Sequence, residues 1–160
     1  MLTLIALVLA STLTSTVRIA PPTEPGERLV LTGTMFRADG RTPVANMVLI
    51  AYHTNVKGVY PDRMTSGNRG SLQGRLRTDA KGRYRIETIR PGGYPDSEAP
   101  AHIHLSVQPE GKKGIYLDEV IFDDDPRTNR FRGQKGFKVV KLTKTKGVWM
   151  GSYDIILPPD

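Results

Sequence analysis

Cysteine is absent from this chain of 160 residues. Without thiols the protein can form no disulfide bonds, and it can hold neither an iron–sulfur cluster nor a thiolate-bound zinc ion. Long hydrophobic runs are also missing: the apolar stretch at residues 1–10 is shorter than the roughly 20 residues that cross a bilayer as a helix. Any metal site must therefore use nitrogen and oxygen ligands, and we expect no membrane-spanning helix.

Helical periodicity is scarce as well, with only a weak indication of a helix near residues 125–131. Short β-rich runs instead alternate with turn signals made of Gly, Pro, Asp and Asn. A hairpin is expected over residues 74–89. The other expected strands cover residues 29–36, 44–52, 102–108, 116–122, 137–142 and 149–157. This pattern predicts an all-β sandwich.

The N-terminal apolar segment, residues 1–10, resembles the hydrophobic part of a signal peptide, although no basic residue precedes it. Small residues before Ser11 suit cleavage by a signal peptidase. We therefore divide the chain into a signal peptide or disordered lead, residues 1–20, and a single domain, residues 21–160. The protein is exported to the periplasm or the extracellular space if the segment is a signal peptide, and is cytoplasmic otherwise.

The formal charge of +7 is unevenly distributed, because residues 127–146 contain eight basic and no acidic residues. Such a stretch is typical of nucleic-acid-binding surfaces. Here the lysines alternate with apolar residues, as in a strand with one solvated side, and no nucleic-acid-binding motif accompanies them. We therefore expect no nucleic-acid partner and no membrane partner. The sequence leaves the oligomeric state open.

Two of the three histidines form the pair His102 and His104, separated by one residue. On a strand, side chains two residues apart point to the same face, with α-carbons roughly 6.5–7 Å apart. Both imidazoles can then reach one metal ion. Apolar residues at 101, 103, 105 and 107 indicate that the opposite face of this strand is buried.

Residues 48–107 contain more of a distinctive pattern. Its elements are residues 52–60 (YHTNVKGVY), 74–79 (GRLRTD), Gly82, Tyr84, 88–91 (TIRP), 94–95 (YP) and 101–104 (AHIH). In this order and spacing, the sequence resembles the catalytic core of the intradiol ring-cleavage dioxygenases, the catechol and protocatechuate dioxygenase type. The resemblance implies a transthyretin-like (prealbumin-like) β-sandwich, of which this chain is a short, single-domain member.

The same resemblance implies a non-haem Fe(III) cofactor bound by Tyr60, Tyr94, His102 and His104. Ferric iron is a hard cation that favours anionic oxygen, which the two phenolates supply. By similarity, Tyr60 and Tyr94 are also catalytic, and Tyr94 leaves the iron when a catechol binds. The implied reaction inserts both atoms of O2 into a small catechol-type substrate and opens its ring to a muconate-type diacid.

The sequence departs from the family at three positions, and the mildest change is Tyr52 in place of a frequent tryptophan. Ala99 stands where the family usually has an arginine that holds the catechol, so Arg63, Arg77 or Arg90 would have to supply a guanidinium group. Glu119 aligns with a position that is usually glutamine. The sequence identifies neither the catechol nor the effect of Ala99, although the excess of positive charge suits an anionic substrate.

Two other functions remain open. The hairpin motifs also occur in transthyretin-like modules that bind no metal, so the chain could be a non-catalytic binding module. A zinc hydrolase built on the histidine pair would need a carboxylate partner, for which Glu98 is the near candidate. The remaining tyrosines are expected to be packing residues: Tyr52, Tyr84, Tyr116 and Tyr153.

Overall fold

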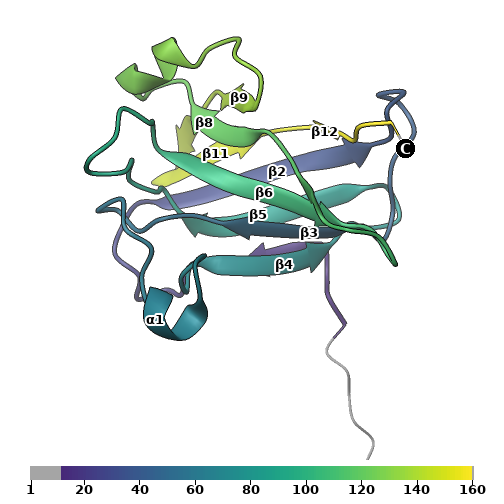
Figure 1. Ribbon diagram of the computed structural model, residues 1–160, viewed down its shortest axis with the longest axis horizontal. Coiled ribbons are helices and arrows are strands. Elements are labelled where there is room, and N and C mark those ends of the chain that lie inside the picture. The colour runs from purple at the N-terminus through teal and green to yellow at the C-terminus, as the bar shows by residue number, and fades with distance from the viewer. Residues whose placement is uncertain (1–11, 160) are drawn as a thin grey trace, which may run out of the picture.

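A computed structural model describes residues 12–159 as two β-sheets packed face to face (Figure 1). The first sheet has the order β1 (Thr16–Arg18), β5 (Arg83–Ile89), β2 (Arg28–Phe36), β11 (Val148–Ser152) and β10 (Thr143–Thr145), with β12 (Ile155–Ile156) beside β2. The second has the order β4 (Gln73–Arg77), β3 (Val48–Tyr52), β6 (His102–Gln108), β8 (Glu119–Phe122) and β9 (Phe137–Val140), with β7 (Ile115–Tyr116) beside β6. The prediction of an all-β sandwich is therefore confirmed.

Helix is confined to two short segments of the described chain. These are α1 (Arg63–Ser66), within the loop that follows β3, and the 3-10 helix η1 (Pro126–Arg130), at the position of the weak helical indication. Neither is long and apolar enough to span a membrane.

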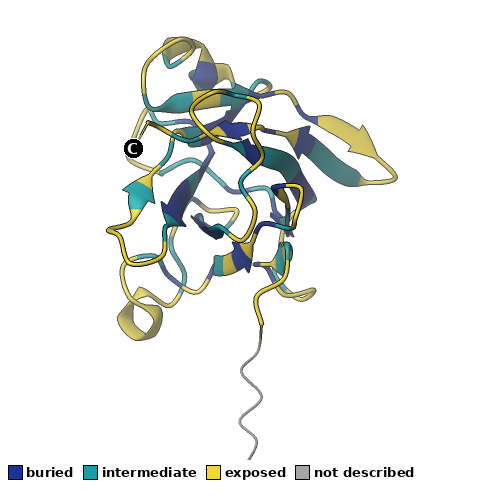
Figure 2. Cartoon of the chain, turned by 90° about the vertical axis from the view of Figure 1, so that its right-hand side faces the viewer, coloured by how far each residue is buried: buried dark blue, intermediate teal, exposed yellow. Residues whose placement is uncertain are grey.

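The core lies between the two sheets, where alternate residues of each strand meet (Figure 2). On β6, Ile103, Leu105 and Val107 are at most 1% exposed, which confirms the predicted buried face of the histidine strand. From the opposite sheet, Leu29 and Leu31 of β2 are fully buried against them. The same alternation turns the histidines of β6 away from the core.

The predicted hairpin over residues 74–89 is wrong. Both strands form, but β4 pairs with β3 and β5 pairs with β2, so the connection crosses from one sheet to the other. The Thr78 hydroxyl donates to the Val44 carbonyl at 2.7 Å and accepts from the Met47 amide at 2.9 Å. These bonds tie the end of β4 to another loop, and a local turn signal cannot reveal them.

Several predicted element boundaries also change. The strand expected over residues 116–122 is split into β7 and β8, and the strand expected over 149–157 is split into β11 and β12. Residues 16–20, expected in the lead, belong to the domain: β1 pairs with β5, and Ile19 and Ala20 are buried. The domain therefore begins before residue 21, whereas the predicted signal segment, residues 1–10, lies outside the described residues.

Candidate metal centre

The site lies at the start of β6, where two long loops meet it. His102 and His104 stand on β6, and His104 pairs across the strands with Tyr52 of β3. Tyr60 belongs to the loop after β3, and Tyr94 to the loop after β5. The structure therefore brings together the four side chains that the sequence singled out, from three segments of the chain.

Hydrogen bonds and a close backbone approach tie the two tyrosine loops to each other. The Gly92 amide donates to the Asn55 carbonyl at 2.9 Å, and the Thr54 hydroxyl donates to the Gly92 carbonyl at 2.7 Å. Gly58, with φ of 75°, lies so close to Gly93 that an added Cβ would be 1.9 Å from the Gly93 carbonyl oxygen. The loops that carry Tyr60 and Tyr94 are thus held at a fixed separation.

Four polar atoms converge at one point between these segments. The Tyr60 hydroxyl oxygen lies 2.6 Å from that of Tyr94 and 2.9 Å from Nε2 of His104. The Tyr94 oxygen lies 3.3 Å from Nε2 of His104 and 3.2 Å from Nε2 of His102, and the two Nε2 atoms are 3.1 Å apart. Ligands about 2.1 Å from a common cation are separated by about 3 Å, so these spacings fit one bound ion.

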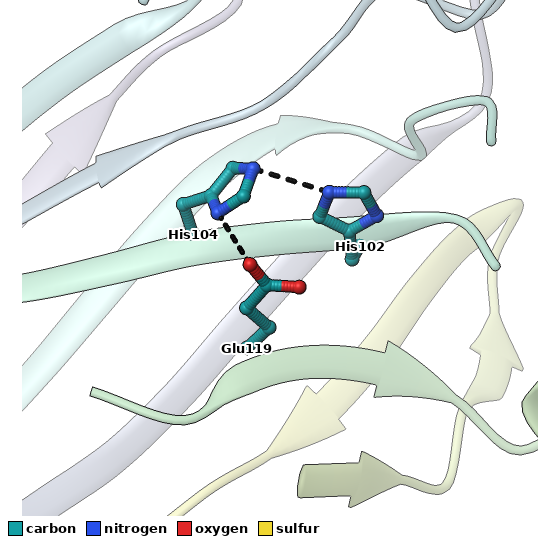
Figure 3. A group of neighbouring side chains, drawn as sticks. All are labelled: His102, His104 and Glu119. Atoms are coloured by element: carbon teal, nitrogen blue, oxygen red, sulfur yellow. Dashed lines mark hydrogen bonds and ion pairs between the residues drawn. The ribbon is translucent and has the colours of Figure 1, made fainter. Parts of the chain in front are cut away.

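The hydrogen bonds of the imidazoles fix which nitrogen is free. Nδ1 of His102 lies 2.7 Å from the Pro100 carbonyl, and Nδ1 of His104 lies 3.0 Å from a carboxylate oxygen of Glu119 (Figure 3). Both partners are acceptors, so each Nδ1 carries the hydrogen and each Nε2 presents a lone pair. Two lone pairs therefore face each other at the point where the tyrosine oxygens also converge.

Burial prepares these groups electrostatically for a cation. Burial lowers the pKa of His102, which keeps its imidazole neutral and able to act as a ligand. Burial, together with the Tyr94 hydroxyl, raises the pKa of Tyr60 above its ordinary value of about 10. A phenolate at Tyr60 consequently needs a nearby positive charge. Two imidazole nitrogens and two phenol oxygens form a nitrogen and oxygen donor set that fits ferric iron.

The carboxylates and arginines near the site differ from the expectations. Glu98 pairs with Arg130 and points into solvent, so it offers no carboxylate to a zinc site. Arg77 donates to the Asn46 carbonyl, and Arg90 pairs with Asp124. Of the three candidate arginines, Arg63 is the one with a recorded contact to a site residue, with its guanidinium 5.7 Å from the centre of the Tyr60 ring.

Of the tyrosines assigned to packing, two are buried in the core: Tyr84 and Tyr153, joined by a 2.6 Å bond from the Tyr84 hydroxyl to the Tyr153 carbonyl. Tyr116 is 70% exposed, so its assignment as a packing residue is wrong. Tyr52 packs, but within the site: its ring stacks on His104 with centroids 4.5 Å apart.

The third histidine, His53, is a structural residue next to the site. It is fully buried, its Nδ1 donates to the Thr54 carbonyl at 2.7 Å, and its Nε2 accepts from the Thr88 hydroxyl at 2.6 Å. Both nitrogens are therefore satisfied by neutral protein groups, and burial lowers its pKa to about 4. His53 differs in this respect from the histidine pair, whose Nε2 atoms face the convergence point.

A cavity of about 680 Å³ lies away from this centre. It lies on the outer face of the first sheet, is lined by residues such as Arg28, Val30 and Met150, and includes none of the four convergent residues. The convergent atoms, and not cavity size, identify the candidate site.

The close approach of Gly58 to Gly93 gives a testable expectation for the site. Gly58→Ala should destabilise the fold by more than about 2 kcal/mol and weaken metal binding, because the new Cβ must push the Tyr60 and Tyr94 loops apart. Gly111→Ala is the matched control, since Gly111 has a similar φ of 67° but open space around its Cβ position. Urea unfolding and metal titration of both variants test this, and equal effects would contradict it.

The fold and the site together define a class: a β-sandwich in which two loops bring two tyrosines to a pair of histidines on one strand. A family model described as Dioxygenase matches residues 7–130 of the sequence. The chain therefore belongs to the intradiol ring-cleavage dioxygenase family.

Two curated relatives illustrate this membership. Catechol 1,2-dioxygenase 2 of Acinetobacter lwoffii is 31% identical over 125 residues, which cover 68% of this chain and 45% of that protein. The protocatechuate 3,4-dioxygenase beta chain of Burkholderia cepacia is 33% identical over 112 residues, covering 63% of this chain and 47% of that one. The chain thus spans about half the length of these curated relatives.

Solved structures share the fold. The dioxygenase domain of a dioxygenase–carbohydrate-binding fusion from Streptomyces sp. SirexAA-E superposes with a TM-score of 0.74 at 22% identity, covering 95% of this chain and 92% of that one. Catechol 1,2-dioxygenase from Acinetobacter sp. ADP1 gives a TM-score of 0.71 at 25% identity, covering 91% of this chain and 57% of that one.

Proposed function

We propose that the protein is a non-haem Fe(III) intradiol dioxygenase with Tyr60, Tyr94, His102 and His104 as the metal ligands. The observation that carries this proposal is the convergence of two phenol oxygens and two unprotonated Nε2 atoms, with separations of 2.6–3.3 Å. A binding module without metal has no need for such a donor set, so the membership of the family and the geometry favour the enzyme.

All four residues would bind the ion, and Tyr94 would also accept a proton from the substrate. When bound, the ferric ion would supply the Lewis acidity that lets a catechol bind as its dianion and react with O2. Buried His102 and half-buried His104 would be the imidazole ligands, with their Nδ1 hydrogens held by Pro100 and Glu119. Once released by the substrate, the Tyr94 phenolate would accept a catechol proton at its oxygen.

We further propose that the substrate carries an anionic group, such as a carboxylate on the catechol ring. The guanidinium groups of Arg63 and Arg69 lie 5.7 Å from the centre of the Tyr60 ring and 5.2 Å from that of Tyr52. Within residues 12–159 neither arginine makes an ion pair or a side-chain hydrogen bond. Two guanidinium groups without a negatively charged partner, both beside the site, suit a substrate that carries a negative charge.

Arg69→Gln should therefore change substrate preference more than the intrinsic rate. We expect kcat/KM for 3,4-dihydroxybenzoate to fall about tenfold, the worth of one charge-assisted hydrogen bond, with little change for unsubstituted catechol. Arg77→Gln is the control, because Arg77 is bound to the Asn46 carbonyl, away from the tyrosines. An equal loss on both substrates would contradict this role of Arg69.

The reaction itself is tested by product analysis. The iron-loaded protein would be incubated under 18O-labelled dioxygen with catechol and, in a second reaction, with 3,4-dihydroxybenzoate, and the products of each reaction analysed by mass spectrometry. The proposal expects a muconate-type diacid that contains two labelled oxygen atoms. Intact catechol, or a product cleaved outside the two hydroxyl-bearing carbons, would refute it.

A further inference from the structure

His104 is held on several sides, and one of its contacts differs in kind from those of the other histidines. Its ring stacks on Tyr52, with an angle of 15° between the planes, and its Nε2 faces Tyr60. Its Nδ1 contacts the carboxylate of Glu119, the first residue of β8, at 3.0 Å (Figure 3). For His53 and His102, the acceptor at Nδ1 is a neutral backbone carbonyl.

The position of Glu119 indicates that it acts through His104 and does not bind the ion itself. Donor atoms of His102, His104 and Glu119 lie within 4.8 Å of one another, which by itself would also suit a site with two histidines and one carboxylate. The recorded contact of Glu119, however, is with Nδ1, whereas the tyrosine oxygens and His102 contact Nε2 of the same ring. The carboxylate therefore contacts the ring nitrogen that points away from the convergence of the tyrosine oxygens and the Nε2 atoms.

We infer that Glu119 is a positioning residue that makes His104 the stronger donor of the two histidine ligands. A carboxylate that accepts the Nδ1 hydrogen fixes the tautomer and the ring orientation, and draws the proton toward itself, which raises the electron density at Nε2. His102 bonds a neutral carbonyl and gains no such increase. The two histidines would then be electronically unequal, and this inference rests on the proposed metal centre.

Glu119→Gln and Glu119→Leu separate the charge of this side chain from its hydrogen bond. Glutamine keeps an acceptor for the Nδ1 hydrogen but removes the negative charge, whereas leucine removes both. In the iron-free protein, 15N NMR should show the Nδ1–H tautomer of His104 in the native protein and in Glu119→Gln, and a mixture of tautomers in Glu119→Leu. This readout needs neither iron nor activity.

The iron-loaded proteins give two further readouts. We expect the iron affinity to fall about tenfold in Glu119→Gln and about 100-fold in Glu119→Leu, the range typical of outer-shell partners of metal ligands. The tyrosinate-to-iron absorption band should move to longer wavelength in both variants, because a weaker His104 donor makes the iron a better electron acceptor. Glu87→Gln is the control: Glu87 is also ion-paired, to Arg18 and Arg85, but on the other sheet.

Each alternative outcome is decisive. If both Glu119 variants keep the native affinity, band and tautomer, the inference is wrong although the metal centre stands. If Glu119→Gln binds no iron at concentrations that saturate the native protein, Glu119 is a ligand and the positioning role is overturned. If the native protein itself takes up no iron, the proposed function fails and this inference fails with it.

Discussion

Tyr94→Phe is expected to abolish ring cleavage and to lower iron affinity by more than about 100-fold. Changing a residue that only orients a metal ligand already costs 10–100-fold in affinity or activity, so removing a ligand atom should cost more. The Tyr94 oxygen also lies within 3.3 Å of three other donor atoms, and phenylalanine leaves that corner of the site without a donor. Iron titration and the visible spectrum of the variant measure the effect.

Tyr116→Phe is the matched control for this substitution. It removes the same hydroxyl group from a tyrosine that is 70% exposed and has no recorded contact with the four site residues. The account expects native iron affinity and a native spectrum for this variant. If Tyr94→Phe also retained the native spectrum, Tyr94 would not be a ligand and the four-residue centre would have to be abandoned.

The second large effect is an acid-dependent loss of stability that originates at His53. This side chain is fully buried and neutral, with a pKa lowered by burial to about 4 from an ordinary value of 6.5. Because the folded pKa lies below the unfolded one, protonation favours the unfolded chain. The contribution is fully present above pH 6.5 and disappears as the pH falls toward 4, at a cost of about 3 kcal/mol.

Urea unfolding of the iron-free protein at pH 7 and pH 4 measures this effect. His53→Gln should be less stable than the native protein at pH 7, because it replaces a satisfied buried group, but should lose about 3 kcal/mol less on acidification. The difference between the two proteins isolates His53 from the other titrating groups. Equal losses of stability in both proteins would show that His53 does not titrate between folded and unfolded states.

The strand that carries the histidine pair could be predicted from sequence because its signal is local. Period-two alternation predicts a strand over residues 102–108, the range that β6 occupies. It also predicts that Ile103 and Leu105 face the core, where both are buried. The order of Tyr60, Tyr94 and the histidines gave the family, now supported by the family model. Both signals depend on spacing along the chain and not on contacts across it.

What the sequence could not reveal depends on contacts between distant segments. The hydroxyl of Thr78 bonds two residues more than 30 positions away, at the end of β4 where the chain crosses from one sheet to the other. The pairing of Glu119 with His104 needs the register of β8 beside β6, which no motif encodes. Likewise Arg69 has no spacing rule to connect it with Tyr52, although the fold brings them together.

The most direct test of the account is the visible absorption spectrum of the purified, iron-loaded protein, recorded before and after addition of catechol. Ferric iron bound by the phenolates of Tyr60 and Tyr94 predicts a red protein with a broad visible absorption band. This band should shift when the catechol displaces one phenolate. A colourless protein that takes up no iron would contradict the metal centre and leave the four convergent side chains as a hydrogen-bonded cluster.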